Sequence, residues 1–260
     1  MKTRIISALC MLPLLIVLYF GGIPLLIAAA LIAMIGADEF TKGFQALGVR
    51  PSRKIVFLMG IILYGVHLLI GFQPMLLLGW IVLSVAVSLI YGWDIKNRGP
   101  YDALATLTTI LYVILFPYHM VLIDNTDYPI MVWMVIIAAF AADIMAYFTG
   151  MAFGKHKMCP NLSPKKTVEG AVGGLLGSAI AAGIFGYFFM PEHLIESIVI
   201  GLFGGLVSMA GDLTASAFKR QMGIKDYGKL IPGHGGILDR FDSVIFVAPA
   251  IYYFIIFILP

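Results

Sequence analysis

The chain of 260 residues is 61% hydrophobic and only 12% charged, and its formal net charge is +3. Soluble domains hold about 45–50% apolar and about 25% charged residues, so this composition excludes a soluble globular protein. The apolar residues fall in runs of about 20, the length of a membrane-spanning helix and about twice that of a barrel strand. Because lipid offers the backbone no hydrogen-bond partner, these runs predict an all-α, polytopic integral membrane protein.

We predict nine transmembrane helices, separated by clusters of Gly, Pro or charged residues. They run over about 4–20, 22–45, 54–71, 74–92, 101–123, 129–152, 169–190, 194–219 and 239–259. The first run follows Lys2 and Arg4, as in a signal peptide, but no polar mature domain comes after it, so we interpret it as a retained span. Pro117 predicts a kink in the fifth span. The two cysteines, Cys10 and Cys159, are too few for a disulfide framework, and we expect no bridge.

The basic residues define a topology. With the N-terminus in the cytoplasm, all 17 Lys and Arg fall in cytoplasmic segments or the helix ends beside them. The opposite loops carry Asp124, Asp127 and Glu192 but no Lys or Arg. The C-terminus then lies on the opposite side. We treat residues 1–260 as one membrane domain, with N-terminal spans over about 1–125 and a catalytic site carried by about 129–260.

Several acids lie within or at the ends of apolar spans. Counting ~1.5 Å per residue places Asp38, Asp143 and Asp212 in the cytoplasmic half of a ~30 Å hydrocarbon core or at its edge. Intramembrane charges are costly and usually mark function, so Asp143, with no nearby base in sequence, is predicted to line a site. For Asp38 and Glu39 two interpretations stay open: a helix end satisfied by Lys42, or a functional role.

The stretch 212–242 holds the densest charge in the chain. Asp212, Ser216 and Lys219 are spaced i, i+4, i+7 and share one helical face, and Asp239 and Asp242 share another at the start of the last span. Carboxylates from two helices are suited to Mg²⁺, which takes oxygen ligands and shares them with substrate phosphates. We therefore predict a metal site at Asp212, Asp239 and Asp242, whereas a simple helix-terminus role for the last two would not explain Asp212.

Between these acids lie bases and the glycine turn 232–236. Its glycines allow backbone N–H groups to approach a ligand closely, although the turn is not a P-loop. Acids, bases and a glycine turn together suit polyphosphate chemistry. The candidate catalytic bases are Lys219, Arg220, Lys225, Lys229, His234 and Arg240. Nucleic-acid binding is not expected, because the chain lacks a soluble basic surface or an aromatic platform.

A second candidate region is the loop that leads into the seventh span. Thr167 can cap the incoming helix with Glu169 in its first turn, and Lys165 and Lys166 lie beside that helix N-terminus. Two interpretations of this arrangement are equally open: an anion-binding site, or a capped helix start with lysines that only mark the cytoplasmic side. Glycines 173, 174 and 177 permit close helix packing, within the chain or in a homodimer.

At this point a resemblance can be stated. The pattern Ser216-x-x-Lys219-Arg220-x4-Lys225-Asp226-x-Gly228-x2-Ile231-Pro232-x-His234-Gly235-Gly236-Ile237-x-Asp239-Arg240-Phe241-Asp242 resembles the signature of the phosphatidate cytidylyltransferase (CDP-diacylglycerol synthase) family. The segments 163–170 and 143–150 also resemble that family, with Val168 standing where an aromatic residue is usual. The resemblance is specific to the C-terminal half.

The resemblance implies that CTP and phosphatidic acid react to CDP-diacylglycerol and pyrophosphate in phospholipid biosynthesis, with Mg²⁺ at the aspartates. A second cation, monovalent or divalent, is left open. The bases between Lys219 and Arg240 would divide between the lipid phosphate and the leaving group. The expected contacts on the CTP side are Asp143, Ser163, Lys165, Lys166, Thr167 and Glu169. The implied location is the bacterial inner membrane, with the site facing the cytoplasm.

Two alternatives remain. A CTP-dependent polyprenol or phytol kinase would move the γ-phosphoryl group to a lipid alcohol and would need a base for its hydroxyl. An ion-coupled transporter would also carry buried acids and a broken glycine-rich loop, but transporters tend to have inverted repeats and sites near the midplane, and the sequence shows neither.

Overall fold

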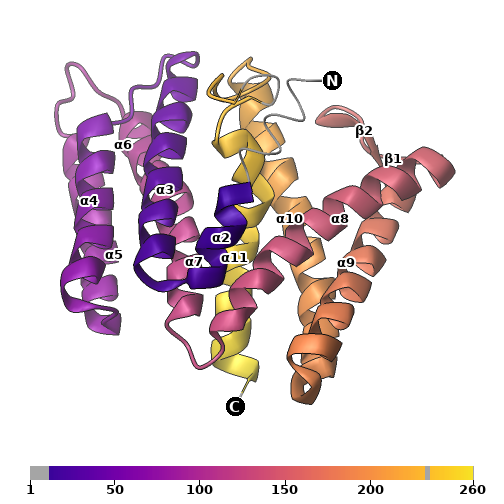
Figure 1. Cartoon of the computed structure of the whole chain (residues 1–260). Coiled ribbons are helices and arrows are strands. Elements are labelled where there is room, and N and C mark those ends of the chain that lie inside the picture. The colour runs from indigo at the N-terminus through magenta and orange to yellow at the C-terminus, as the bar shows by residue number, and fades with distance from the viewer. Residues whose placement is uncertain (1–11, 232–234, 260) are drawn as a thin grey trace. The chain divides into compact units, whose positions relative to one another are not determined.

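The computed structural model describes residues 12–231 and 235–259, and helices dominate it (Figure 1). The elements are α2 (Leu12–Phe20), α3 (Gly22–Gln45), α4 (Arg53–Ile70), α5 (Pro74–Tyr91), α6 (Pro100–Thr108), the π-helical η1 (Thr109–Leu115), α7 (Phe116–Asp124), the 3-10 turn η2 (Pro129–Met131), α8 (Val132–Phe153), β1 (Lys157–Cys159), β2 (Ser163–Thr167), α9 (Val168–Phe189), the 3-10 turn η3 (Pro191–His193), α10 (Leu194–Gln221) and α11 (Leu238–Ile258).

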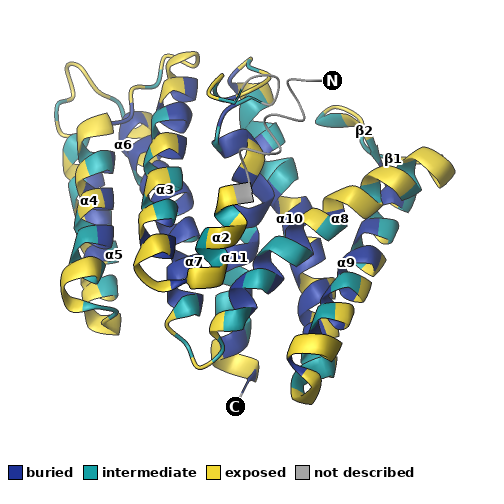
Figure 2. Cartoon of the chain, in the orientation of Figure 1, coloured by how far each residue is buried: buried dark blue, intermediate teal, exposed yellow. Residues whose placement is uncertain are grey.

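Eight helical segments in the described part of the chain are long and apolar enough to cross a membrane. They match eight of the nine predicted spans to within a few residues, so the all-α integral membrane fold is confirmed. Residues 4–11 of the predicted first span, 4–20, lie outside the described residues, and α2 is its described part. Many large apolar side chains are exposed, such as Leu69 at 84% and Met75 at 80% (Figure 2). Such surfaces are compatible with lipid rather than with water.

The chain forms two compact units. The first comprises Met1–Asn125 with Gln221–Arg240, and the second comprises Thr126–Arg220 with Phe241–Pro260. The segment 221–240, which the sequence analysis grouped with the catalytic half, belongs with the N-terminal helices. Helix α11 therefore begins in the first unit and continues in the second.

The centre of the first unit is the continuous segment made by α6, η1 and α7. Of the 18 most apolar consecutive residues in this segment, 78% are buried. Sequence predicts a kink at Pro117. The structure changes from α to π geometry over Thr109–Leu115, directly before this proline. A proline ring collides with the carbonyl four residues earlier and provides no N–H, so a wider turn accommodates it.

The second unit contains a tightly packed pair, α8 and α9. A Cβ added to Gly174 would lie 2.8 Å from the carbonyl oxygen of Ala142, and one added to Gly170 would lie 2.8 Å from that of Ala146. The predicted close packing by glycine is confirmed, and it occurs within the chain. The glycines that suggested a homodimer are thus already engaged with α8, and the homodimer stays a prediction without their support.

A short β-hairpin connects α8 to α9, where the sequence analysis expected only a loop. Lys157 pairs with Thr167 and Cys159 with Ser163 in antiparallel register. The strands are too short and too polar to show the alternation that marks a strand in sequence. Cys159 is a free thiol, and Cys10 lies outside the described residues.

Candidate active site

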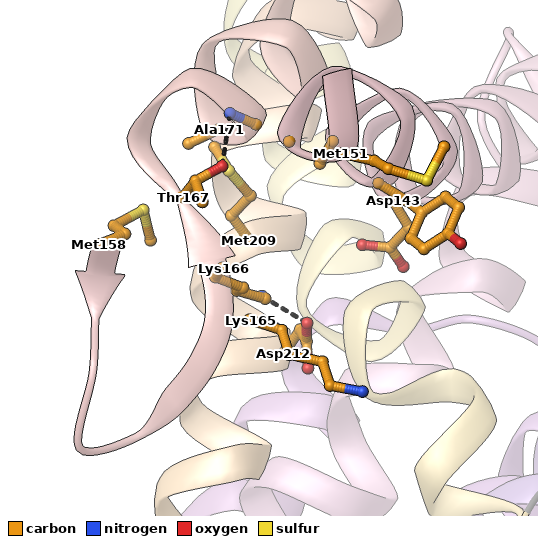
Figure 3. A pocket seen from close by; sticks show the side chains of 13 residues that line it. Asp143, Met151, Met158, Lys165, Lys166, Thr167, Ala171, Met209 and Asp212 are labelled. Carbon is orange, nitrogen blue, oxygen red and sulfur yellow. Dashed lines mark hydrogen bonds and ion pairs between the residues drawn. The ribbon is translucent and has the colours of Figure 1, made fainter. Parts of the chain in front are cut away.

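A pocket of about 370 Å³ opens in the second unit between the hairpin and helices α8, α9 and α10 (Figure 3). Its polar lining comes from Asp143, Lys165, Lys166, Thr167 and Asp212. Its apolar lining includes Tyr147, Met151, Met158 and Met209. The structure thus brings together five residues that sequence singled out, including Asp143 as a lining residue. A wall that is charged on one part and apolar on another suits an amphiphilic ligand.

Helix α10 presents the predicted face of polar side chains. The Ser216 hydroxyl lies 3.5 Å from Asp212 Oδ1, as the i, i+4 spacing requires. Asp212 also forms an ion pair with the Lys166 ammonium group of the hairpin (Figure 3). The two candidate regions, the hairpin and α10, therefore meet at a direct contact between an acid and a base.

A second such contact lies deeper. Asp242 on α11 is buried, and its Oδ2 atom lies 3.8 Å from Lys219 Nζ, with side chains only 12% and 13% exposed. Helices α10 and α11 approach closely here, because a Cβ on Gly211 would lie 3.0 Å from the Asp242 carbonyl oxygen. The charges of Asp143 and Asp212 also act on Asp242. Acids from three helices thus share one region, with lysines as counter-charges.

The neighbourhood of Asp143 extends to the start of α11. The Ser243 hydroxyl lies 3.5 Å from Asp143 Oδ2, and the backbone N–H of Ser243 donates to Asp242 Oδ1 at 2.9 Å. Sequence reasoning did not single out Ser243. Its signal was available in retrospect, since a serine directly after a candidate ligand at a helix start is well placed to bond carboxylates.

Within the described ranges, no three His, Cys, Asp or Glu side chains are arranged closely enough to hold one ion. Asp212 and Asp242 nevertheless offer carboxylate oxygens, the donors that Mg²⁺ prefers, and each lies beside a lysine. This donor chemistry fits the predicted metal, whose presence stays a prediction.

Asp239, the third predicted ligand, belongs to the first unit and has a structural task there. Its Oδ2 atom accepts hydrogen bonds from the backbone N–H groups of Tyr227 at 2.8 Å and Gly236 at 3.0 Å. The side chain is buried, and it closes the loop before α11 on itself. A metal role for Asp239 stays a prediction from the sequence.

The start of α9 is built as predicted. The Thr167 hydroxyl accepts the Gly170 N–H at 3.1 Å and is buried, so it caps the helix. Glu169 turns toward the base of the hairpin, where it accepts the backbone N–H groups of Lys155 and His156 and contacts His156 Nδ1 at 2.6 Å. The structure therefore gives Glu169 a role in holding the hairpin, and His156 is a partner that sequence reasoning missed.

The remaining predicted residues lie nearer the surface. Lys225, Lys229 and Arg240 are exposed in the first unit, and His234 lies outside the described residues. Arg220 is exposed in the second unit, where its Nε contacts the Leu162 carbonyl oxygen at 3.5 Å. Ser163 is half-buried at the start of β2.

The open question about Asp38 and Glu39 is settled by their partners. Asp38 pairs with Lys42 at 2.5 Å and with Arg53, as a helix end near an interface would. Glu39 is only 7% exposed and accepts the N–H groups of Ile237 at 3.1 Å and Leu238 at 2.9 Å. The helical period offered a signal for the burial of Glu39. It follows Gly36 by three residues and precedes Gly43 by four, so all three share the buried face of α3.

The sequence of this chain is similar to those of known proteins. The profile of the cytidylyltransferase family matches residues 2–258. The chain belongs to the cytidylyltransferase family. The match extends the resemblance of the C-terminal half to almost the entire chain, including the N-terminal helices that looked only suitably apolar.

Three relatives illustrate the range of similarity, and each is named phosphatidate cytidylyltransferase. The protein of Staphylococcus haemolyticus is 35% identical over 95% of this chain and 94% of its own length. That of Bacillus subtilis is 37% identical over 65% of each chain. That of Synechocystis is 48% identical over 46% of this chain and 41% of its own length, so there the aligned part spans less than half of the relative.

Proposed function

We propose that this cytidylyltransferase joins CTP to phosphatidic acid, giving CDP-diacylglycerol and pyrophosphate for phospholipid biosynthesis. The observation that carries the proposal is the pocket in which Lys166 of the hairpin meets Asp212 of an apolar helix. Charged groups there can bind phosphates, while Met151, Met158 and Met209 offer an apolar wall to a lipid. The relatives that align over nearly their whole length carry the corresponding name.

The reaction does not require a strong general base from the protein. An oxygen of the phosphatidate monoester is already nucleophilic near neutral pH, and it attacks the α-phosphorus of CTP while pyrophosphate leaves. Binding and orientation are then the main contributions of the side chains. Lys165 and Lys166, beside the α9 N-terminus, suit the nucleotide phosphates, because ammonium groups bind anions and a helix N-terminus is partially positive. Lys219 suits a phosphate that lies near Asp242.

Other bases complete the proposed set. Arg220, Lys225, Lys229, His234 and Arg240 would divide between the lipid phosphate and the pyrophosphate. Asp212 and Asp242 would hold Mg²⁺, and the sequence adds Asp239 to them. When bound, the ion neutralises phosphate charge and polarises the reacting phosphoryl group. A second cation remains open.

The proposed location is the cytoplasmic face of a bacterial inner membrane. All 17 Lys and Arg gather on one side of the predicted topology, and that side is cytoplasmic by the positive-inside rule. A water-soluble nucleotide and a membrane lipid can meet only at such an edge. This placement also agrees with the pocket, whose lining combines charged and apolar side chains.

Labelled CTP tests the proposal. Purified protein is incubated with phosphatidate, magnesium and CTP carrying ³²P at the α or the γ position. Lipid label from the α position alone supports the proposed reaction. Lipid label from the γ position alone would identify a lipid kinase and refute it, and uptake into vesicles without nucleotide turnover would favour a transporter. Omission of phosphatidate and of magnesium in turn provides the controls.

A further inference from the structure

Glu39 lies outside the predicted active site, yet it holds the start of the last helix. Its carboxylate, on α3, accepts the backbone N–H groups of Ile237 and Leu238. The first N–H groups of a helix have no partner within that helix, and a negative charge near them is favourable. Glu39 therefore serves as a cap for α11 that is delivered from a different helix.

The loop before α11 is shaped around this carboxylate. A Cβ added to Gly228 or Gly236 would collide with the carboxyl group of Glu39, and at each position the three nearest atoms all belong to Glu39. Two glycines eight residues apart thus leave the space that one buried acid fills. Any side chain at either position would displace the loop or the acid.

A second carboxylate holds the same loop. Asp239 accepts the N–H groups of Tyr227 and Gly236. Gly235 lies between these contacts with a φ of 88°, which favours glycine. The Tyr227 ring packs 5.7 Å from that of Phe40, the neighbour of Glu39. Both ends of the loop are thereby fixed to α3 and to the first turn of α11.

This loop carries much of the proposed phosphate-binding set. Lys225 and Lys229 lie on it, and both are exposed. We propose that Glu39 is a positioning residue of the transferase, which holds the described parts of the loop, 225–231 and 235–236, in their working conformation without touching a substrate. The inference rests on the proposed function for its kinetic consequence, but the anchoring itself is a property of the fold.

The variant Glu39→Gln tests it with little change in volume. The N–H groups of Ile237 and Leu238 bind different oxygens of Glu39, and glutamine replaces one of these by an NH₂ group that cannot accept, so one charge-assisted bond is lost. We expect kcat/KM to fall about 10- to 100-fold, with a raised KM for CTP or phosphatidate. Asp38→Asn is the matched control on the same helix, and it should leave both constants near wild type, because its partners are Lys42 and Arg53. A Glu39→Gln enzyme with a lower kcat but unchanged KM values would indicate only a smaller folded fraction and would overturn the positioning role.

Hydrogen exchange provides an independent measurement. Backbone amides of 227–238 should exchange faster in Glu39→Gln than in wild type, and Asp38→Asn should not change them. If wild-type protein fails to convert CTP and phosphatidate, the proposed function fails, while unchanged exchange in Glu39→Gln would still refute the anchoring.

A coupled pair of variants covers the case in which Glu39→Gln folds poorly. Gly236→Ala should impair activity strongly by itself, because its Cβ meets the carboxylate. On a Glu39→Ala background that Cβ has space, so the second substitution should add little further loss. Losses that simply multiply would show that Gly236 and Glu39 act independently, contrary to the inference.

Discussion

Replacing Lys219 by methionine is the most informative perturbation of the site. The change keeps the length and apolar stem of the side chain but removes the charge 3.8 Å from Asp242 Oδ2. Both side chains are nearly buried, and the charges of Asp143 and Asp212 also act on Asp242. Without the ammonium group, three acids would face one another with one fewer counter-charge.

The expected magnitude follows from this geometry. Two unit charges about 4 Å apart attract by ~4 kcal/mol at an effective dielectric constant of about 20. Removing one partner of a buried ion pair costs ~3–5 kcal/mol, since the remaining charge stays desolvated. A loss of ~3 kcal/mol in a chain of this size corresponds to a melting temperature lower by ~6–12 °C on the scaling for globular proteins. Turnover should fall at least ~100-fold if Lys219 contacts a reacting phosphate.

The assay separates stability from catalysis. Melting temperatures are measured in one detergent for wild type, Lys219→Met and the double variant Lys219→Met/Asp242→Asn, alongside turnover of CTP. The double variant should regain most of the lost stability, because neither charge remains, and it should stay inactive. Lys219→Arg is the control that keeps the charge. The reasoning is refuted if Lys219→Met melts within ~1 °C of wild type, or if the double variant is no more stable than the single one.

Three further predictions concern the hairpin, the helix pair and the metal. Thr167→Ala should destabilise the protein by ~1 kcal/mol through loss of the α9 cap and should raise the KM for CTP, whereas Thr167→Ser keeps the accepting oxygen and should be near wild type. Gly174→Ala should lower the free energy of unfolding by ~1–3 kcal/mol, because its Cβ meets the Ala142 carbonyl. Gly65→Ala is the control and should not destabilise, because a Cβ on Gly65 meets nothing within 4 Å. Equal melting temperatures of the two variants would contradict the packing. Chelation by EDTA should abolish turnover and added MgCl₂ should restore it, and activity that persists in EDTA would remove the metal from the site.

The fold was accessible from sequence because a bilayer restricts the possible structures. Helices α5 and α6 each begin at a proline, Pro74 and Pro100, and a proline at the first helical position is a strong local signal for a helix start. The π-helical segment at 109–115 was not accessible, because it depends on how the chain absorbs Pro117 rather than on a pattern of its own. The hairpin was missed because its strands are short and polar.

The candidate site was accessible where spacing places side chains on one helix. Asp212 and Ser216 are an example. Contacts between distant elements were not accessible in the same way. The pair of Lys166 with Asp212 depends on the path of the hairpin, and the bonds of Glu39 depend on a loop nearly 200 residues away. An isolated sequence contains no local signal for either.

That separation of Glu39 from its donors has a consequence for biosynthesis. Its two partners follow it by 198 and 199 residues, so a ribosome must add all the helices from α4 to α10 before they appear. Helix α3 is inserted early with its acid lacking these bonds, and the arrival of α11 supplies them. Completion of the loop thus requires that α11 has been made, and a chain truncated before residue 237 would contain the helices from α3 to α10 but neither N–H donor of Glu39.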